Sequence, residues 1–218
     1  MPDKWDYGGA FERYPCESGT IVFDSGSRLK VHDIFEPLPK FMTEADVIFT
    51  DSPWNTGNLR SFYTKADRIL LSEFTAFYKR LFECVKNIHP HVCYLEIGKE
   101  FLPEFVIEMR HIYKYVTFYN SSYYHKQKNH CYVVRGSQKA RAPKLDDMDE
   151  ETIIEWVCEN ENYNCIGDLC MGRGLVAINA AKNKKQFVGT ELNHKRLSVA
   201  IERLAAMGLK YRRKENES

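Results

Sequence analysis

The stretch Ile166-Gly-Asp-Leu-Cys-Met-Gly-Arg-Gly174 joins a predicted strand to a predicted helix through a glycine-rich turn. The segment Asn164–Leu169 predicts the strand, and the small-residue segment Leu175–Lys182 predicts the helix. Glycines between them let the backbone approach a ligand closely, and the free N–H groups at the start of a helix attract anionic atoms. The sequence therefore predicts a ligand site at this junction.

An acidic residue follows at the end of the next predicted strand. Gln186–Thr190 predicts that strand, and Glu191 comes directly after it, 17 residues beyond Gly174. In dinucleotide-binding folds a carboxylate at this place accepts hydrogen bonds from both hydroxyls of a ribose. The third glycine of a GxGxxG motif is replaced by Ala177, which argues against a pyrophosphate site and therefore against NAD.

Strands and helices alternate along the rest of the chain. The other predicted strands are Thr20–Phe23, Asp46–Thr50 and Val92–Ile97, and the other predicted helices are Leu70–Val85, Pro103–Ile112, Glu151–Cys158 and His194–Met207. Two more strands, Tyr115–Ser121 and Cys131–Arg135, predict a hairpin with a polar tip at His125–His130. This order predicts an α/β fold with a largely parallel sheet and one antiparallel hairpin.

The overall composition is that of a globular protein. A length of 218 residues and a net charge of +1 predict one domain over residues 1–218 and no strong global field. No apolar run approaches the roughly 20 residues of a membrane span, and the N-terminal residues lack the apolar core of a secretory signal. We therefore expect a cytoplasmic protein without membrane contact. The 7 cysteines form no CxxC pair, which favours a reducing compartment and no structural metal.

The near-neutral net charge conceals a basic, Tyr-rich segment at residues 109–145. This segment holds 8 Lys and Arg residues and no Asp or Glu, so the remainder holds 23 basic and 30 acidic residues. Basic residues interleaved with aromatic ones suit phosphate contact and base stacking. The predicted nucleic-acid contacts are Lys126, Lys128, Arg135, Lys139 and Arg141. A hairpin with one core face and one solvent face explains the same composition equally well.

A second motif lies at the end of another predicted strand, in Val47-Ile-Phe-Thr-Asp-Ser-Pro-Trp-Asn-Thr-Gly-Asn58. This motif resembles the catalytic motif of amino-methylating DNA methyltransferases, which act on an exocyclic amine of adenine or cytosine, a poor nucleophile whose lone pair is delocalised into the ring. The resemblance implies that the Asp51 carboxylate and the Ser52 carbonyl accept the two amine hydrogens and so localise that lone pair. It also implies that the flat ring of Trp54 stacks on a base swung out of a duplex. Taken alone, Asp-Ser-Pro-Trp is more simply an ordinary turn after a strand.

Together the two stretches resemble the amino-methylating DNA methyltransferases of the circularly arranged β-type group. In that group the catalytic motif D-P-P-Y/F/W precedes a cofactor pattern that reads roughly D-P-F-x-G-S-G-T-T, a helix, and G-x-E-L-N-x-x-Y. The cofactor pattern is matched by Asp168, Gly172, Gly174, Gly189, Glu191 and Asn193. Cys170 stands where the group has Phe, and Arg173 stands where it has a small residue.

The catalytic motif departs from the group at one position. Ser52 stands in place of the first proline, so the turn keeps its carbonyl group and loses a fixed φ angle. Upstream, Leu29-Lys-Val-His-Asp33 resembles a short strand that ends in G-D in the group. This resemblance implies that Asp33 approaches the adenine amino group of the cofactor, although an aspartate here could equally cap a helix.

The resemblance implies a Rossmann-like methyltransferase fold with S-adenosyl-L-methionine as cofactor. The implied catalytic residues are Asp51, Ser52, Pro53 and Trp54, and the implied cofactor-binding residues are Asp33, Asp168, Cys170, Gly172, Gly174, Glu191 and Asn193. It further implies DNA as the partner, in a bacterial cell or a phage-infected host, and it leaves a homodimer open. The start D-x-P-W-N-T-G favours adenine N6, and little chain is left for target recognition, so we expect a short or relaxed target sequence.

Three alternatives stay open at this point. An RNA adenine methyltransferase and a DNA cytosine-N4 methyltransferase use closely similar motifs. A binding subunit that kept the fold and lost the chemistry is favoured by Ser52 and Cys170, and it is opposed by the retention of Asp51, Trp54 and Glu191.

Overall fold

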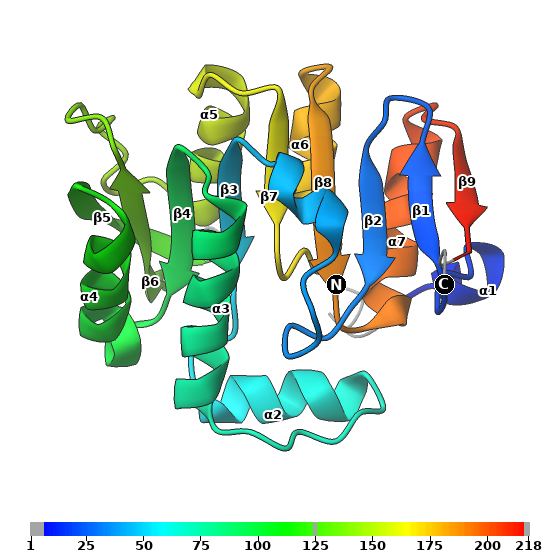
Figure 1. The fold of residues 1–218 in the computed structure, drawn as a ribbon, viewed down its shortest axis with the longest axis horizontal. Coiled ribbons are helices and arrows are strands. Elements are labelled where there is room, and N and C mark those ends of the chain that lie inside the picture. Colours follow the sequence, from blue (N-terminus) through cyan, green and yellow to red (C-terminus); the bar gives the residue numbers. More distant parts are fainter. Residues whose placement is uncertain (1–6, 124–125, 216–218) are drawn as a thin grey trace.

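One mixed sheet forms the centre of the molecule in the computed structural model, which describes residues 7–123 and 126–215. Its strands are β1 (Thr20–Phe23), β2 (Arg28–Val31), β3 (Val47–Asp51), β4 (Val92–Ile97), β5 (Tyr115–Tyr123), β6 (Lys126–Ser137), β7 (Cys165–Asp168), β8 (Gln186–Glu191) and β9 (Tyr211–Lys214). They are arranged in the order β5-β6-β4-β3-β7-β8-β2-β1-β9 (Figure 1). The middle strands β4, β3, β7, β8 and β2 are parallel to one another.

Helices cover both faces of this sheet. They are α1 (Ala10–Arg13), α2 (Thr56–Lys65), α3 (Phe74–Ile88), α4 (Leu102–Ile112), α5 (Glu150–Asn160), α6 (Leu175–Lys182) and α7 (His194–Ala206), with 3-10 turns η1 (Lys40–Glu44) and η2 (Lys99–Phe101). One core contains side chains of α5, α6 and α7, and the other contains side chains of α3, α4 and η1. Along β3, Val47 and Phe49 enter the first core and Ile48 enters the second, as strand alternation requires. The predicted α/β fold is thereby confirmed.

Both edges of the sheet are antiparallel, although the sequence predicts antiparallel strands at one edge only. The predicted hairpin is present as β5 and β6, which pairs with β4. At the other edge β1 pairs antiparallel with β2 and with β9. Strand β9 was missed because it reads Tyr-Arg-Arg-Lys, with three exposed basic side chains and no apolar alternation to reveal it.

Helix α2 is, like the short helix α1 and the turns η1 and η2, another element that the sequence does not predict. Its buried side chains are Leu59 and Tyr63, so its apolar face is narrow. Its start is fixed by Asn55, whose side chain accepts a hydrogen bond from the Asn58 N–H at 2.9 Å. In Figure 1, α2 covers neither face of the sheet and instead lies across the ends of the middle strands.

The sheet has two ends with different surroundings. We call the carboxyl end the side at which the parallel strands finish, and the amino end the opposite side. Because β6 is antiparallel to β4, Tyr132 lies opposite Ile97 at the carboxyl end and Ser137 lies opposite Val92 at the amino end. The tip of the hairpin therefore belongs to the carboxyl end, and the loop that follows Ser137 starts at the amino end.

The described part of the chain contains no helix that is both long enough and apolar enough to cross a membrane. All seven cysteines are free thiols, and six of them are buried.

Candidate active site

Four acidic side chains gather at the carboxyl end of the sheet. Asp51, Asp168 and Glu191 are the last residues of β3, β7 and β8, and Glu96 lies next to the last residue of β4. The register of β3 and β4 sets Asp51 directly beside Glu96. Glu96 is fully buried, and neither of its carboxylate oxygens has a hydrogen-bond partner among the described residues. Such a concentration of buried acids is costly for a fold and typical of a ligand site.

Burial dominates the ionisation of this acidic cluster. It raises the pKa of Asp168 to about 8, and the neighbouring Asp51 carboxylate acts in the same direction. Burial also raises the pKa of Asp51, while the Arg196 guanidinium opposes that shift. The pKa of Glu96 lies well above its usual range because the side chain is buried and Asp51 is close. Burial therefore favours the protonated form of Asp168 in the free protein.

The glycine turn between β7 and α6 adopts the geometry that its sequence predicts. Gly172 and Gly174 have φ angles of 54° and 78°, which favour glycine. A Cβ atom on Gly174 would lie 2.7 Å from the Cβ of Ala200, so only glycine permits this packing of the turn on α7. The Cys170 N–H donates to Asp168 Oδ1 at 3.1 Å, which fixes the start of the turn.

Glu191 joins this turn to the start of α7. Its Oε2 atom accepts a hydrogen bond from the Gly172 N–H at 2.7 Å, and its Oε1 atom accepts one from the Asn193 N–H at 2.9 Å. A carboxylate oxygen accepts up to two hydrogen bonds, so the side chain has capacity left for a ligand. Asn193 itself caps α7 by accepting from the Lys195 N–H at 2.9 Å.

The motif after β3 is buttressed by residues from other strands. The Tyr123 hydroxyl donates to Asp51 Oδ2 at 3.1 Å, and the Trp54 and Tyr123 rings meet edge to face with centroids 5.3 Å apart. The Ser52 hydroxyl donates to the Glu96 carbonyl oxygen at 3.4 Å. This hydrogen bond holds the turn against β4, at the position where the β-type group has a proline to stiffen it. Pro53 follows in this buried turn.

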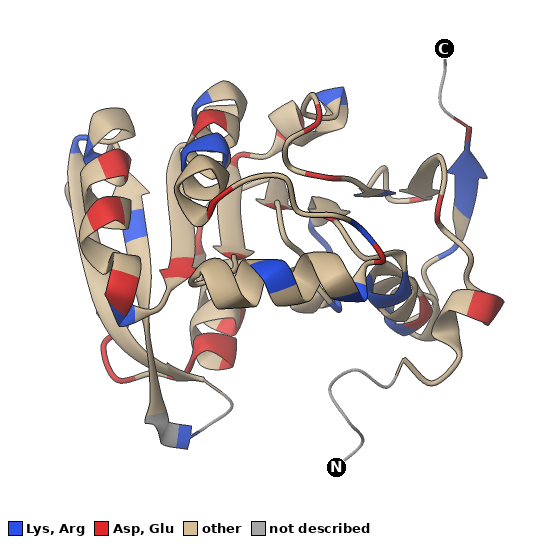
Figure 2. Ribbon diagram, turned by 90° about the horizontal axis from the view of Figure 1, so that it is seen from below, with Lys and Arg blue, Asp and Glu red and all other residues tan. Residues whose placement is uncertain are grey.

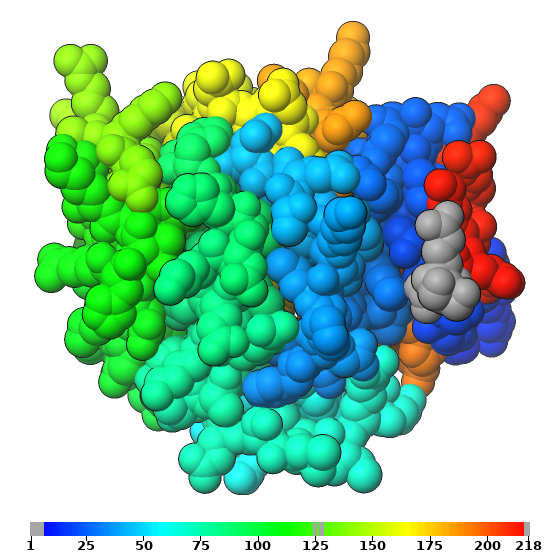
Figure 3. Space-filling view, viewed as in Figure 1, coloured from blue at the N-terminus to red at the C-terminus, as the bar shows by residue number. Residues whose placement is uncertain are grey.

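A cavity of about 50 Å³, partly open to solvent, lies between these residues and α2. Its lining includes Asp51, Cys170 and Glu191 at the strand ends and Phe62 and Tyr63 of α2. Small-molecule sites enclose roughly 300 to 1,000 Å³, so α2 leaves space for only part of a cofactor. Seen from the carboxyl end, α2 lies in front of the strand ends (Figure 2), and in the space-filling view α2 and the following segment cover the lower edge of the molecule (Figure 3).

Asp33 also lies beside this cavity, where it holds α2. Its Oδ1 atom accepts hydrogen bonds from the Tyr63 hydroxyl at 2.6 Å and from the Phe35 N–H at 3.1 Å. The Arg68 guanidinium approaches Asp33 at 3.8 Å and Glu36 at 3.6 Å. The alternative interpretation of Asp33 as a helix cap is wrong, because no described helix begins there.

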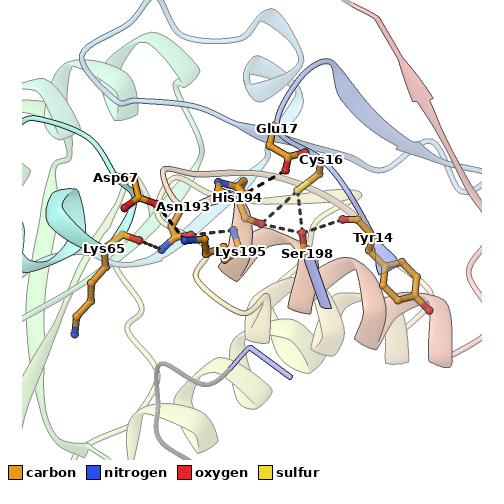
Figure 4. A network of polar contacts seen from close by, with 9 residues as sticks. All are labelled: Tyr14, Cys16, Glu17, Lys65, Asp67, Asn193, His194, Lys195 and Ser198. Carbon is orange, nitrogen blue, oxygen red and sulfur yellow. Dashed lines mark hydrogen bonds and ion pairs between the residues drawn. The ribbon is translucent and has the colours of Figure 1, made fainter. Parts of the chain in front are cut away.

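Polar contacts with the start of α7 complete the attachment of α2. Asn193 Nδ2 donates to the Lys65 carbonyl oxygen at 2.9 Å, and Lys195 Nζ lies 3.1 Å from Asp67 Oδ2 (Figure 4). The Arg196 guanidinium lies 5.1 Å from the centre of the Phe62 ring. Because most of these contacts are polar and partly exposed, α2 is attached more weakly than a core helix.

The predicted nucleic-acid residues are divided between the two ends of the sheet. Lys126 is exposed at the carboxyl end, and the side chain of Lys128 lies outside the described residues. Lys139 and Arg141 are exposed in the loop after β6 and therefore belong to the amino end. The basic segment thus does not form the single surface that its composition suggests.

Arg135 requires a correction, because it lies inside the fold rather than on its surface. It is 4 % exposed, and its Nε donates to the Tyr94 hydroxyl at 2.9 Å. Its Nη2 lies 3.5 Å from Glu161 Oε1. A cation with these internal partners contributes first to the packing of β4 and β6 against the end of α5.

Several residues of the candidate site are not predicted from the sequence, among them Glu96 and Tyr123 and the cavity-lining Phe62, Tyr63 and Arg196. Glu96 is a lone acid within the apolar strand Val92–Ile97, and that anomaly could have revealed it. Tyr123 belongs to the Tyr-rich segment, but nothing local singles it out from the five other tyrosines of that segment.

Comparison with known proteins identifies the fold through structure alone. No protein-family model and no curated protein matches the chain. The M1.HpyAVI–SAM complex superposes with a TM-score of 0.58 at 15 % identity, covering 81 % of this chain and 98 % of that one. TTHA0409 of Thermus thermophilus, a putative DNA modification methylase complexed with S-adenosyl-L-methionine, gives 0.57 at 14 % identity, covering 83 % and 93 %.

A third solved structure belongs to the same group of matches. The PvuII DNA methyltransferase, which is cytosine-N4-specific, gives a TM-score of 0.57 at 10 % identity, covering 81 % of this chain and 86 % of that one. At these identities the likeness concerns the fold. The chain therefore has the Rossmann-like fold of S-adenosylmethionine-dependent methyltransferases, as its sequence predicts.

Proposed function

We propose that this chain is an S-adenosylmethionine-dependent DNA methyltransferase that modifies adenine N6. One observation carries the proposal: two motifs more than 100 residues apart, the Asp51 turn and the turn that precedes Glu191, line the same cavity. In α/β sheets, ligands bind beyond the carboxyl ends of the strands, where this cavity lies.

The chemistry of the residues suits this cofactor. S-adenosylmethionine carries a sulfonium and an ammonium group against one carboxylate, so a cluster of buried acids favours it electrostatically. The spare acceptor capacity of Glu191 suits the ribose hydroxyls, and Asp33 suits the adenine amino group once Tyr63 releases it. The solved structures of M1.HpyAVI and TTHA0409 with this cofactor support the choice.

Binding requires α2 to move, because the cavity beneath it holds about 50 Å³. The contacts of Tyr63 and Arg68 with Asp33 are those that the incoming cofactor would replace. We therefore infer that α2 opens to admit the cofactor and closes again over it, which would exclude water from the site.

When bound, the cofactor supplies an electrophilic methyl group, and the residues of the chain prepare the amine that attacks it. The Asp51 carboxylate and the Ser52 carbonyl accept the two amine hydrogens, and Trp54 supports the face of the flipped base. Tyr123 holds Asp51 in place through its hydroxyl. Because burial raises the pKa of Asp51, this carboxylate is suited to take the proton that the methylated amine loses.

Adenine is proposed as the target because the motif begins D-x-P-W-N-T-G. The fold likeness to a cytosine-N4-specific enzyme makes cytosine N4 the second candidate. An intact arrangement of Asp51, Trp54 and Tyr123 supports an enzyme over a subunit without activity, since an abandoned site has no physical reason to keep it.

The test is methylation of DNA of mixed sequence with cofactor labelled in its methyl group, followed by nucleoside analysis, with RNA in a parallel reaction. The proposal predicts label in N6-methyldeoxyadenosine from DNA. Label in N4-methyldeoxycytidine would replace adenine by cytosine as the target, label in RNA alone would replace DNA as the substrate, and no label would contradict an enzymatic role.

A further inference from the structure

A second cavity, of about 570 Å³, lies at the amino end of the sheet, away from the candidate active site. It is open to solvent and is bounded by the end of α4, the start of β5 and the loop after β6. Its charged lining residues are Arg110, Lys114 and Arg135, and no acidic side chain lines it among the described residues. We call it the basic groove.

The surroundings of the basic groove add to its positive charge. Ala140 and Ala142 form one of its walls, and the side chains of Lys139 and Arg141 next to them are exposed. These positions fall in the segment 109–145, which holds no Asp or Glu. The groove therefore gathers cations from a helix end, a strand and a loop that only the fold brings together.

Arg135 contributes least to this charge, because it is 4 % exposed and its guanidinium is engaged by the Tyr94 hydroxyl and by Glu161, which does not line the groove. The exposed cations that a ligand can reach are Arg110 and Lys114 in the lining and Lys139 and Arg141 beside it.

Aromatic side chains form part of the same lining. Tyr113 is fixed by its hydroxyl, which donates to the Pro90 carbonyl oxygen at 2.9 Å. Tyr115 is 37 % exposed, and Lys114 Nζ lies 5.4 Å from the centre of its ring. A wall that presents the exposed ring of Tyr115 beside cations suits a ligand that carries both phosphates and flat groups.

We propose that the basic groove binds the sugar-phosphate backbone of a nucleic acid, at a second site distinct from the catalytic cavity. Its cations are spread over three elements, which suits a row of phosphates better than a single anion. The choice of nucleic acid as the phosphate-bearing partner rests on the proposed function.

The separation of the two sites sets a length for this partner. Asp51 pairs with Glu96, whereas Ser137 pairs with Val92 at the other end of β4. Glu96 and Val92 are four residues apart, so at roughly 3.3 Å per residue the two ends are separated by about 13 Å along β4. With one base pair per 3.4 Å or so, a duplex must extend at least about four base pairs beyond the target to reach the groove.

The test compares binding of long and short duplexes by fluorescence anisotropy over a range of salt concentrations. In the full-length protein, Arg110→Glu with Lys114→Glu is expected to weaken binding of a duplex of about 30 base pairs at least about tenfold and to lower the salt slope by about 2. A duplex of about 8 base pairs can occupy the groove or the catalytic cavity but is too short to span both, so the variant is expected to lose less affinity for it than for the long duplex.

The matched control is Arg212→Glu with Arg213→Glu, two exposed cations on β9 at the opposite edge of the sheet. This control is expected to keep the salt slope of the wild type. Unfolding curves check that both variants fold, and Arg110→Gln with Lys114→Gln replaces the charge reversal if that variant does not fold.

Three results would overturn the proposal. The groove variant could bind the long duplex as the wild type does, or both double variants could lose affinity alike. The wild type could also bind inorganic phosphate or a nucleoside triphosphate in the groove, detected by loss of that binding in the groove variant, without binding the duplex. Because the readout is binding, failure of methyl transfer would contradict the proposed function and leave the test of the groove intact.

Discussion

The carboxyl and amino ends of the sheet carry opposite charges in opposite environments. At the carboxyl end, acids are buried around a cavity of about 50 Å³ that α2 covers, and Glu96 is fully buried beside Asp51. At the amino end, cations line an open groove of about 570 Å³. Burying an acid costs desolvation free energy, so a cluster of buried acids is typical of a functional site. Exposed cations cost little free energy and attract anions over a distance that salt screening limits. The difference indicates catalysis at the carboxyl end and binding of an anionic partner at the amino end.

The largest effect on activity is expected from Asp51→Ala, which removes the proposed catalytic carboxylate at the carboxyl end. Without the carboxylate, nothing localises the lone pair of the target amine, so methyl transfer should fall by about 10³-fold or more. Cofactor affinity, measured by calorimetry, should change by no more than about threefold. An equal loss of affinity and activity would contradict the assigned position of Asp51 at the base rather than at the cofactor.

Glu191→Ala should produce the opposite pattern. The change removes an acceptor that holds the Gly172 and Asn193 N–H groups and serves the ribose, so cofactor affinity should fall by about 10- to 100-fold. Saturating cofactor should restore much of the activity. Glu17→Ala, an exposed glutamate, is the control, and a dissociation constant that does not move in Glu191→Ala would remove this residue from the cofactor site.

The pH dependence of stability tests whether the acidic cluster is as buried as described. Burial raises the pKa of Asp168 to about 8, so from about pH 4 to pH 8 the folded chain binds a proton that the unfolded chain releases. Stability of the free protein should therefore fall as pH rises through this window, and Asp168→Asn should flatten that fall. Urea unfolding at pH 5, 7 and 9 measures it, with Asp24→Asn, an exposed aspartate, as control. Equal slopes in wild type and Asp168→Asn would show that this carboxyl does not titrate as proposed.

The smallest effect is expected from loosening α2. Tyr63→Phe with Arg68→Ala removes the hydroxyl and the guanidinium that contact Asp33, and such partly exposed contacts are worth roughly 1 kcal/mol or less each. The rate of cofactor association, followed by stopped-flow fluorescence, should rise a few-fold. An unchanged rate would mean that α2 does not control entry to the cavity.

The elements that local patterns specify were predictable from the sequence. Strand β4 has the predicted bounds Val92–Ile97, because an apolar run bounded by turn residues suffices to define it. The glycine turn and Glu191 were predictable because their spacing is itself the signal. Together these features predicted the fold and the end of the sheet at which the candidate site lies.

The remaining features depend on residues that are distant in sequence. Arg135 is buried because Tyr94 and Glu161 receive it, and neither partner is evident from the basic segment. Tyr123 reaches Asp51 across 72 positions, and the covering of the cavity by α2 depends on contacts with Asp33 and the start of α7. Composition detected the charge of segment 109–145, but only the antiparallel pairing of β6 divides that charge between the two ends.

Calorimetry with S-adenosylmethionine tests whether the acidic cluster at the carboxyl end of the sheet binds a cationic cofactor. Titrations at pH 7 in two buffers of different ionisation enthalpy measure affinity and proton exchange together. We expect one cofactor to bind per chain with net proton release, because a cation near Asp168 lowers the raised pKa of this carboxyl. S-adenosylhomocysteine, which lacks the sulfonium charge, should release fewer protons. If S-adenosylmethionine does not bind at millimolar concentration, the carboxyl end of the sheet is not the cofactor site.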